Sequence, residues 1–63
     1  MFKNLRAEQA RYNLTDAEMG KKLGITRESY TKKKNTGYFT LPEIRILLGL
    51  FKANFEYLFE QEG

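Results

Sequence analysis

Apolar residues recur along the chain at helical spacing and divide it into five short segments. In the first segment, Phe2, Leu5 and Tyr12 fall on one loose helical face. Asn13 follows them, and asparagine tolerates the left-handed conformation in which many helices end. The most regular stripe belongs to the fourth segment and consists of Leu41, Ile44, Leu47, Leu48 and Phe51. The pattern predicts an all-α fold with five helices.

Short polar residues mark where these helices are expected to begin. Thr15 with Glu18, and Thr40 with Glu43, have the spacing of a capping box, which predicts a helix directly after each threonine. Asn54 is a third capping residue and precedes a last short apolar segment. These signals predict the starts of the second, fourth and fifth helices.

The third helix is expected from Arg27 to about Lys34. Thr26 can cap its beginning, and Asn35 with Gly37 can end it. Between the second and third helices only three residues remain to reverse the chain, so the two helices must cross steeply. The spacing therefore predicts a helix-turn-helix unit over about residues 16–34.

Two residues fit a close crossing of these helices. Gly20 has no side chain, which allows a neighbouring segment to approach the second helix. Tyr30, in the middle of the third helix, is placed to anchor it in the core. If Tyr30 faces inward, the helical period points Glu28 and Lys32 almost directly outward.

Composition limits what the chain can do. Its 63 residues form one domain, 1–63, and a domain of this size buries only about 60% of its unfolded surface. Cysteine and histidine are absent, and there is one serine and one aspartate, so we expect no enzyme, no metal site, no cofactor and no small-molecule substrate. The chain begins without an export pattern, and its longest apolar stretch, residues 44–51, is shorter than the roughly 20 residues that cross a bilayer. These features predict a cytoplasmic protein with no membrane partner.

Positive charge is concentrated in the middle of the chain. The net charge is +3, but residues 21–38 contain six basic residues and one acidic residue, whereas residues 39–63 are net acidic. On charge alone, this segment is either a surface for a polyanion or an ordinary solvated face.

Several short motifs share their spacing with one known family. They are "LR" at 5–6, "LT" at 14–15, Gly20, "LGIT" at 23–26 and "LPEIRILLGLFKANFEYLF" at 41–59. Over nearly the whole chain this arrangement resembles the Cro and phage-repressor family of helix-turn-helix regulators, also called XRE-like. The resemblance implies a compact five-helix bundle, like the DNA-binding domain of lambda repressor, that places its third helix in the major groove of DNA.

The resemblance also implies roles for residues of the third helix. At the positions from which family members reach base edges stand Arg27, Glu28, Ser29 and Lys32. At or near the positions that approach phosphates stand Thr31, Lys33, Lys34 and Asn35.

The sequence departs from the family pattern in three respects. Asp16 stands where a glutamine usually touches a phosphate, so we expect it to favour the helix N-terminus instead of DNA. Lys33 stands at an apolar position, and its alkyl stem is expected to cover the edge of the core. An arginine and glutamate pair is replaced by Gln9 and Lys34, so we expect Glu8 to hold Lys34.

The expected function is that of a phage or prophage Cro-like repressor that binds a double-stranded operator, as a homodimer at least on DNA. The expected subunit contact consists of Phe51, Phe55, Tyr57 and Phe59. Two alternatives remain open: an antitoxin-like module that binds a protein, and a single-stranded nucleic-acid binder that uses the lysines with Tyr30, Tyr38 and Phe39. Stacking on bases requires Tyr30 to be exposed, whereas groove reading requires it to be buried.

Overall fold

Five short helices form in the computed structural model, which describes residues 2–61. They are α1 (Lys3–Arg11), α2 (Asp16–Leu23), α3 (Arg27–Thr36), α4 (Leu41–Phe51) and α5 (Phe55–Leu58). Residues 2–61 contain no β-strand, so the predicted all-α class is confirmed. None of the described helices combines the length and apolar character needed to cross a bilayer.

Helices α2 to α5 begin at the side-chain caps that the sequence predicts, whereas α1 begins after Phe2 without a side-chain cap. Thr15 and Thr40 each form a complete capping box with the glutamate three residues later. Thr26 Oγ1 accepts a hydrogen bond from the amide of Ser29 at 3.1 Å, and Asn54 caps α5 in the same way. Because these bonds use only neighbouring residues, each helix start is fixed locally.

Residues with positive φ angles follow the first four helices. Asn13 (φ 55°) and Gly24 (φ 73°) adopt the left-handed conformation that their positions predict. α3 continues to Thr36, two residues beyond the expected end, so Asn35 belongs to the helix and Gly37 (φ 84°) alone ends it. The outer face of α3 is correspondingly longer than predicted.

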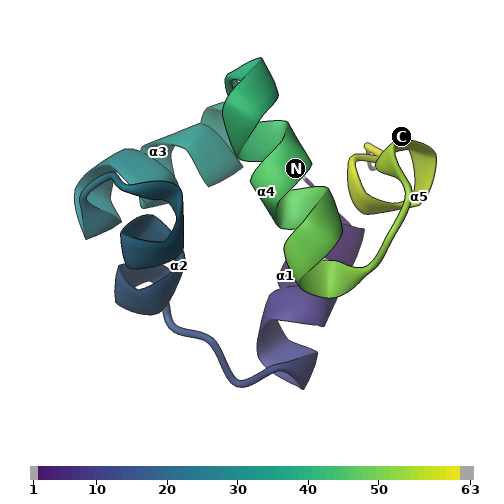
Figure 1. Ribbon diagram of the computed structural model, residues 1–63, viewed down its shortest axis with the longest axis horizontal. Helices are drawn as coiled ribbons and strands as arrows, with labels where there is room; N and C mark the ends of the chain where they lie inside the picture. The colour runs from purple at the N-terminus through teal and green to yellow at the C-terminus, as the bar shows by residue number, and fades with distance from the viewer. Residues whose placement is uncertain (1, 62–63) are drawn as a thin grey trace.

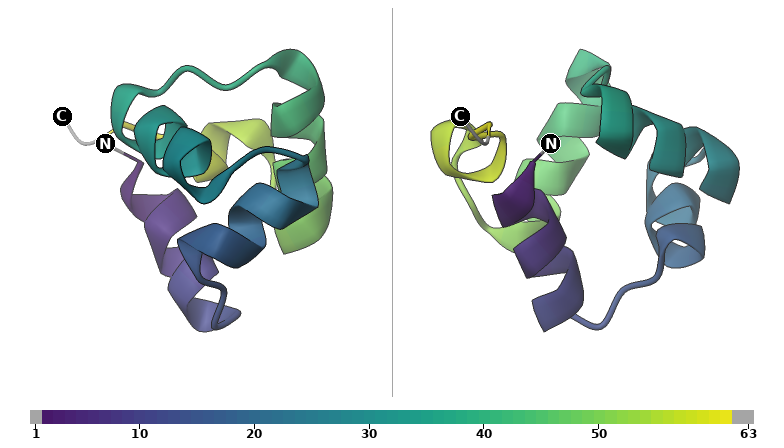
Figure 2. Two further views of the ribbon diagram at one scale, coloured as in Figure 1. Left: turned by 90° about the vertical axis from the view of Figure 1, so that its left-hand side faces the viewer. Right: turned by 180° about the vertical axis from the view of Figure 1, so that it is seen from behind.

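α4 lies between two groups of helices. Figure 1 shows α2 and α3 together on one side of α4, and α1 and α5 on the other, and the views of Figure 2 agree. The molecule measures 27 × 21 × 21 Å. Its buried apolar core draws on all five helices and consists of Phe2, Leu5, Met19, Leu23, Tyr30, Leu47, Phe51 and Leu58.

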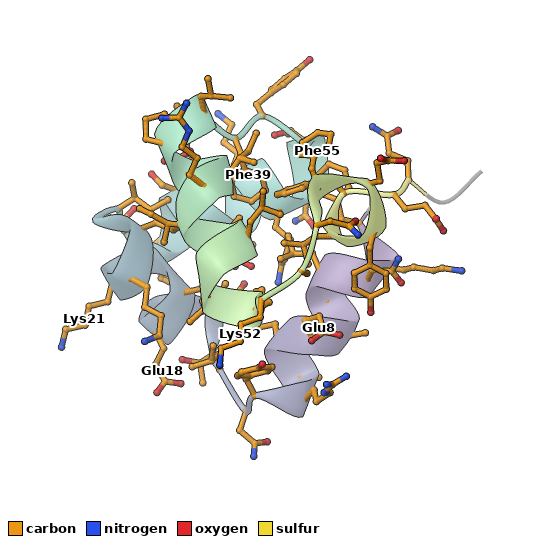
Figure 3. All side chains as sticks on the ribbon, turned by 45° about the vertical axis from the view of Figure 1, so that its right-hand side comes forward. Glu8, Glu18, Lys21, Phe39, Lys52 and Phe55 are labelled. Atoms are coloured by element: carbon orange, nitrogen blue, oxygen red, sulfur yellow. The ribbon has the colours of Figure 1, made fainter. Side chains whose placement is uncertain are left out.

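Tyr30 is fully buried, with 0% of its surface exposed, which confirms that it faces inward. Its ring lies 6.1 Å from that of Phe39, which in turn lies 6.5 Å from Phe2 and 5.8 Å from Phe59. Figure 3 shows Phe39 directed into the space between α4 and α5. The segment after α3 is therefore packed onto the core through the aromatic ring of Phe39.

One position of the predicted α4 stripe is wrong. Leu41, the first residue of α4, is 63% exposed. In the same turn Glu43 is buried, since it caps the helix and pairs with Lys33. The core side of this turn is thus partly polar.

The turn between α2 and α3 passes directly against Gly20. A Cβ atom at this position would lie 2.8 Å from the carbonyl oxygen of Ile25 and 2.9 Å from that of Thr26. The amide of Ile25 also donates to the carbonyl of Gly20 at 2.8 Å. Only glycine permits this backbone contact, which sets the distance between α2 and the start of α3.

We predict opposite effects for alanine at two helical glycines. Gly20→Ala should lower the free energy of unfolding by about 2 kcal/mol or more, because the new methyl group forces backbone atoms apart. Gly49→Ala should raise it by about 0.5–1 kcal/mol, since Gly49 is exposed on α4 and its Cβ would meet no atom within 4 Å. Urea denaturation followed by circular dichroism measures both changes. Equal effects at the two positions would show that Gly20 is not a contact point.

Candidate nucleic-acid interface

The carboxylate of Asp16 joins α2 to α3 and α1. Its Oδ1 accepts hydrogen bonds from Gln9 Nε2 at 2.8 Å and Lys34 Nζ at 2.9 Å. Its Oδ2 accepts from Thr31 Oγ1 at 2.6 Å and from Lys34 Nζ at 3.0 Å. One side chain in the first turn of α2 therefore holds two residues of α3.

Gln9 extends this network into the core. Its Oε1 accepts a 2.8 Å hydrogen bond from the buried Tyr30 hydroxyl, and its Nε2 also donates to the carbonyl of Leu14 at 3.0 Å. No buried side-chain nitrogen or oxygen within residues 2–61 lacks a partner. Burial raises the pKa of Tyr30, and the nearby Asp16 charge raises it further, so the phenol remains a donor at neutral pH.

The hydrogen bonds keep Asp16 ionised. Partial burial alone would raise its pKa, but the bonds from Thr31, Gln9 and Lys34 outweigh burial and lower the pKa to about 2. The side chains of Asp16 and Lys34 are only 22% and 16% exposed, so their ion pair is shielded from solvent. The pair is better protected than an ordinary surface salt bridge.

Lys33 makes a second ion pair across two helices. Its Nζ lies 3.3 Å from Glu43 Oε1 on α4. The pKa of Glu43 is lowered, because hydrogen bonds from Thr40 and Lys33 outweigh the effect of burial. Only part of the Lys33 side chain is exposed, in keeping with the expectation that its stem covers the core edge.

The expected pair between Glu8 and Lys34 is wrong. Glu8 Oε2 instead accepts a 2.9 Å hydrogen bond from the hydroxyl of Tyr57 on α5 and lies 3.5 Å from Arg11 Nη1. Figure 3 shows Glu8 on the part of α1 that faces α5. Glu8 is therefore bonded to α5, while Lys34 pairs with Asp16 on α2.

Three of the four predicted base-contact residues are exposed on the outer face of α3. The side chains of Arg27 and Glu28 are 65% and 79% exposed, and their charged groups lie 3.7 Å apart. Lys32 is exposed and makes no ion pair with any residue of the described chain, whereas Ser29 is half-buried. This face therefore presents cationic donors and one carboxylate acceptor.

An open groove runs between this face and the first turn of α2. Its volume is about 730 Å³, and it is lined by Thr15, Asp16, Ala17, Arg27, Glu28, Thr31 and Lys32. Donors and acceptors on one exposed helix face can form hydrogen bonds with base edges, and the basic side chains can also bind phosphate oxygens. Asp16 adds a negative charge to the same groove.

The predicted phosphate-contact residues occupy different environments. Thr31, Lys33 and Lys34 are held by Asp16 or Glu43, while Asn35 is exposed near the end of α3. Because Lys33 and Lys34 are paired within the protein, fewer basic side chains of residues 21–38 are free to bind a partner.

The residues of the predicted subunit contact also differ in how exposed they are. Phe51 is buried in the core, so it offers no surface to a second subunit. Phe59 is half-buried, whereas Phe55 and Tyr57 are 53% and 41% exposed. An apolar contact through this segment must therefore use the α5 residues Phe55 and Tyr57.

The sequence interpretation missed the central role of Asp16 and the burial of Glu43. An available signal was that Asp16 is the only aspartate in the chain and stands at the start of the helix before the one that carries three consecutive lysines. Its actual partners depend on how α2 and α3 cross, which side-chain spacing alone does not define. Within residues 2–61 no cluster of three or more metal-ligating side chains was found.

Comparisons of the chain with protein-family models, with curated proteins and with solved structures found no match.

We predict that Asp16→Asn weakens the fold in a pH-dependent manner. Because the folded-state pKa is about 2 against an ordinary 3.8, ionised Asp16 stabilises the fold fully above about pH 5. Such a shift corresponds to about 2.5 kcal/mol, which solvent screening reduces to about 1–2 kcal/mol. The difference in free energy of unfolding between the two proteins should therefore shrink as the pH falls from 5 to 2.

Urea titrations at several pH values measure this difference. Glu60→Gln, which removes an exposed carboxylate outside the network, is the control. A wild-type advantage over Asp16→Asn that stays constant down to pH 2 would contradict the pairing of Asp16 with Lys34.

Proposed function

We propose that the chain is a sequence-specific regulator that binds double-stranded DNA, with α2 and α3 acting as a Cro-like helix-turn-helix unit. One observation carries the proposal: Tyr30 is completely buried, while Arg27, Glu28 and Lys32 are exposed along a single groove. This is the arrangement that a helix requires in order to read base edges with one face while the opposite face holds it to the domain.

The dimensions of α3 support insertion into the major groove. An α-helix with its side chains is about 10–12 Å wide, and the major groove of B-DNA is about 12 Å wide. α3 has ten residues, which corresponds to a length of about 15 Å. Its N-terminal half carries Arg27 and Glu28, at the end from which recognition helices contact bases.

The exposed side chains suggest which bases are read. Arg27 and Lys32 can donate to guanine O6 and N7, and Glu28 can accept from the amino group of cytosine. Each good contact discriminates against a wrong base by about 1–3 kcal/mol. Ser29 contributes less surface, and Asn35 is the exposed candidate for a phosphate contact.

A single protomer offers few base contacts, so we propose that two copies bind as a homodimer on DNA. Half-sites are then expected about one helical turn apart, or about 34–36 Å. The protomer has a longest dimension of 27 Å, so two copies can lie side by side along one face of such a site. Phe55 and Tyr57 are the proposed contact between them.

An antitoxin-like protein-binding function is the second candidate. Tyr38, in the segment after α3, and Leu41, the first residue of α4, are both largely exposed, and large exposed apolar side chains can contribute to a protein contact. Single-stranded binding has less support, because Tyr30 is buried and Phe39 is packed into the core, where neither can stack on a base.

We predict that the protein binds duplex DNA and that binding weakens steeply with salt. Log Kd should rise with log salt concentration by about 0.9 per phosphate contacted. Lys32→Gln should weaken binding to a selected duplex about tenfold, since one good contact is worth roughly 1–3 kcal/mol. Selection from a random duplex library, followed by fluorescence anisotropy from 50 to 300 mM salt, provides both measurements.

Lys52→Gln is the matched control, because Lys52 follows the C-terminal end of α4 and lies outside the groove (Figure 3). It removes the same charge and should leave the selected motif unchanged. Absence of an enriched motif, together with capture of a protein through Tyr38 and Leu41, would favour the protein-binding function instead.

A further inference from the structure

Asp16 lies where a DNA-binding surface would ordinarily avoid a carboxylate. It lines the groove beside Arg27 and Lys32. Its carboxylate accepts a hydrogen bond from Thr31 and forms an ion pair with Lys34. Thr31 and Lys34 belong to the group that the family resemblance places against phosphates. The same acidic residue thus reduces the positive charge of the groove and holds two potential phosphate ligands.

We propose that Asp16 is a restraint on phosphate binding: it retains Lys34 inside the protein and lowers the affinity of the groove for DNA of any sequence. The proposal rests on the proposed duplex-binding function and adds to it a means of limiting non-specific binding. Asp16 is here a positioning residue that acts through Lys34.

The geometry of Lys34 supports this role. Its Nζ contacts both Asp16 oxygens, at 2.9 and 3.0 Å, and lies 5.6 Å from the centre of the Tyr30 ring. The carboxylate and the aromatic face together hold the ammonium group against the protein. A lysine that is neutralised in this way displaces no counterion from DNA, so it adds little to non-specific affinity.

Electrostatics favour the same conclusion. Non-specific DNA binding comes almost entirely from phosphate neutralisation, whereas specificity comes from base contacts. With Lys34 and Lys33 held by carboxylates, the exposed cations facing the groove are Arg27 and Lys32. Both stand at predicted base-contact positions. Binding should therefore depend more on base contacts than the charge of residues 21–38 suggests.

The test compares Asp16→Asn with the wild type on a random-sequence duplex. Loss of the carboxylate frees Lys34 for one phosphate contact per protomer, so the slope of log Kd against log salt should increase by about 0.9 per protomer. At 0.1 M salt, affinity for the random duplex should rise about five- to tenfold. In Asp16→Asn with Lys34→Met the slope should return to the wild-type value.

Two controls separate this mechanism from simpler ones. Glu18→Gln removes one negative charge from α2, keeps the capping box and breaks no ion pair of the described residues, so its slope should match the wild type. All variants are also made in the Gly49→Ala background, where the expected gain in stability offsets part of the loss at Asp16, and circular dichroism verifies folding.

The outcomes are distinct. An unchanged slope in Asp16→Asn, or an equal increase in Glu18→Gln, would overturn the restraint while leaving duplex binding intact. If the wild type binds no duplex at any salt concentration, the proposed function fails, and the restraint fails with it.

Discussion

The hydrogen bond from the buried Tyr30 hydroxyl to Gln9 is the interaction on which the arrangement of α3 depends. A buried phenol without a partner would cost about 1–3 kcal/mol, so the bond allows a large aromatic ring to fill the core. Gln9 also donates a hydrogen bond to Asp16. Asp16 in turn binds Thr31 and Lys34, so Gln9 links the buried Tyr30 to these two residues of α3. Tyr30 in the core and Asp16 on α2 together fix the rotation of α3 about its axis. The face of α3 opposite Tyr30 remains in solvent.

The three consecutive lysines of α3 have three different environments. Lys34 joins α3 to α2 through Asp16, Lys33 joins it to α4 through Glu43, and Lys32 faces the solvent. Two of the charges therefore stabilise the position of the helix, and the third is available to a partner. A basic run on a short helix can contribute more to tertiary structure than to the surface potential, because opposite charges from neighbouring helices meet it.

The sequence predicted the features that local chemistry determines. Capping boxes at Thr15 and Thr40 define helix starts with bonds between near neighbours. Once Tyr30 is placed inward, the helical period predicts that Glu28 and Lys32 are exposed. Pairings between side chains on different helices were harder to predict from the sequence. Long charged side chains reach several positions, so the choice of Asp16 over Glu8 for Lys34 depends on the crossing of α2 and α3. The same holds for the candidate site. The exposure of Arg27, Glu28 and Lys32 was predictable from the sequence, whereas the pairing of Lys34 with Asp16 was not.

The most direct test of the central claim is a titration of the isotopically labelled protein with duplex DNA, followed by amide chemical shifts. If Tyr30 holds the outer face of α3 toward the double helix, the largest shifts should occur at Arg27, Glu28, Lys32 and the facing Ala17. Amides around Tyr38 and Leu41 should change little. Shifts concentrated around those two residues, with the outer face of α3 unaffected, would contradict the account.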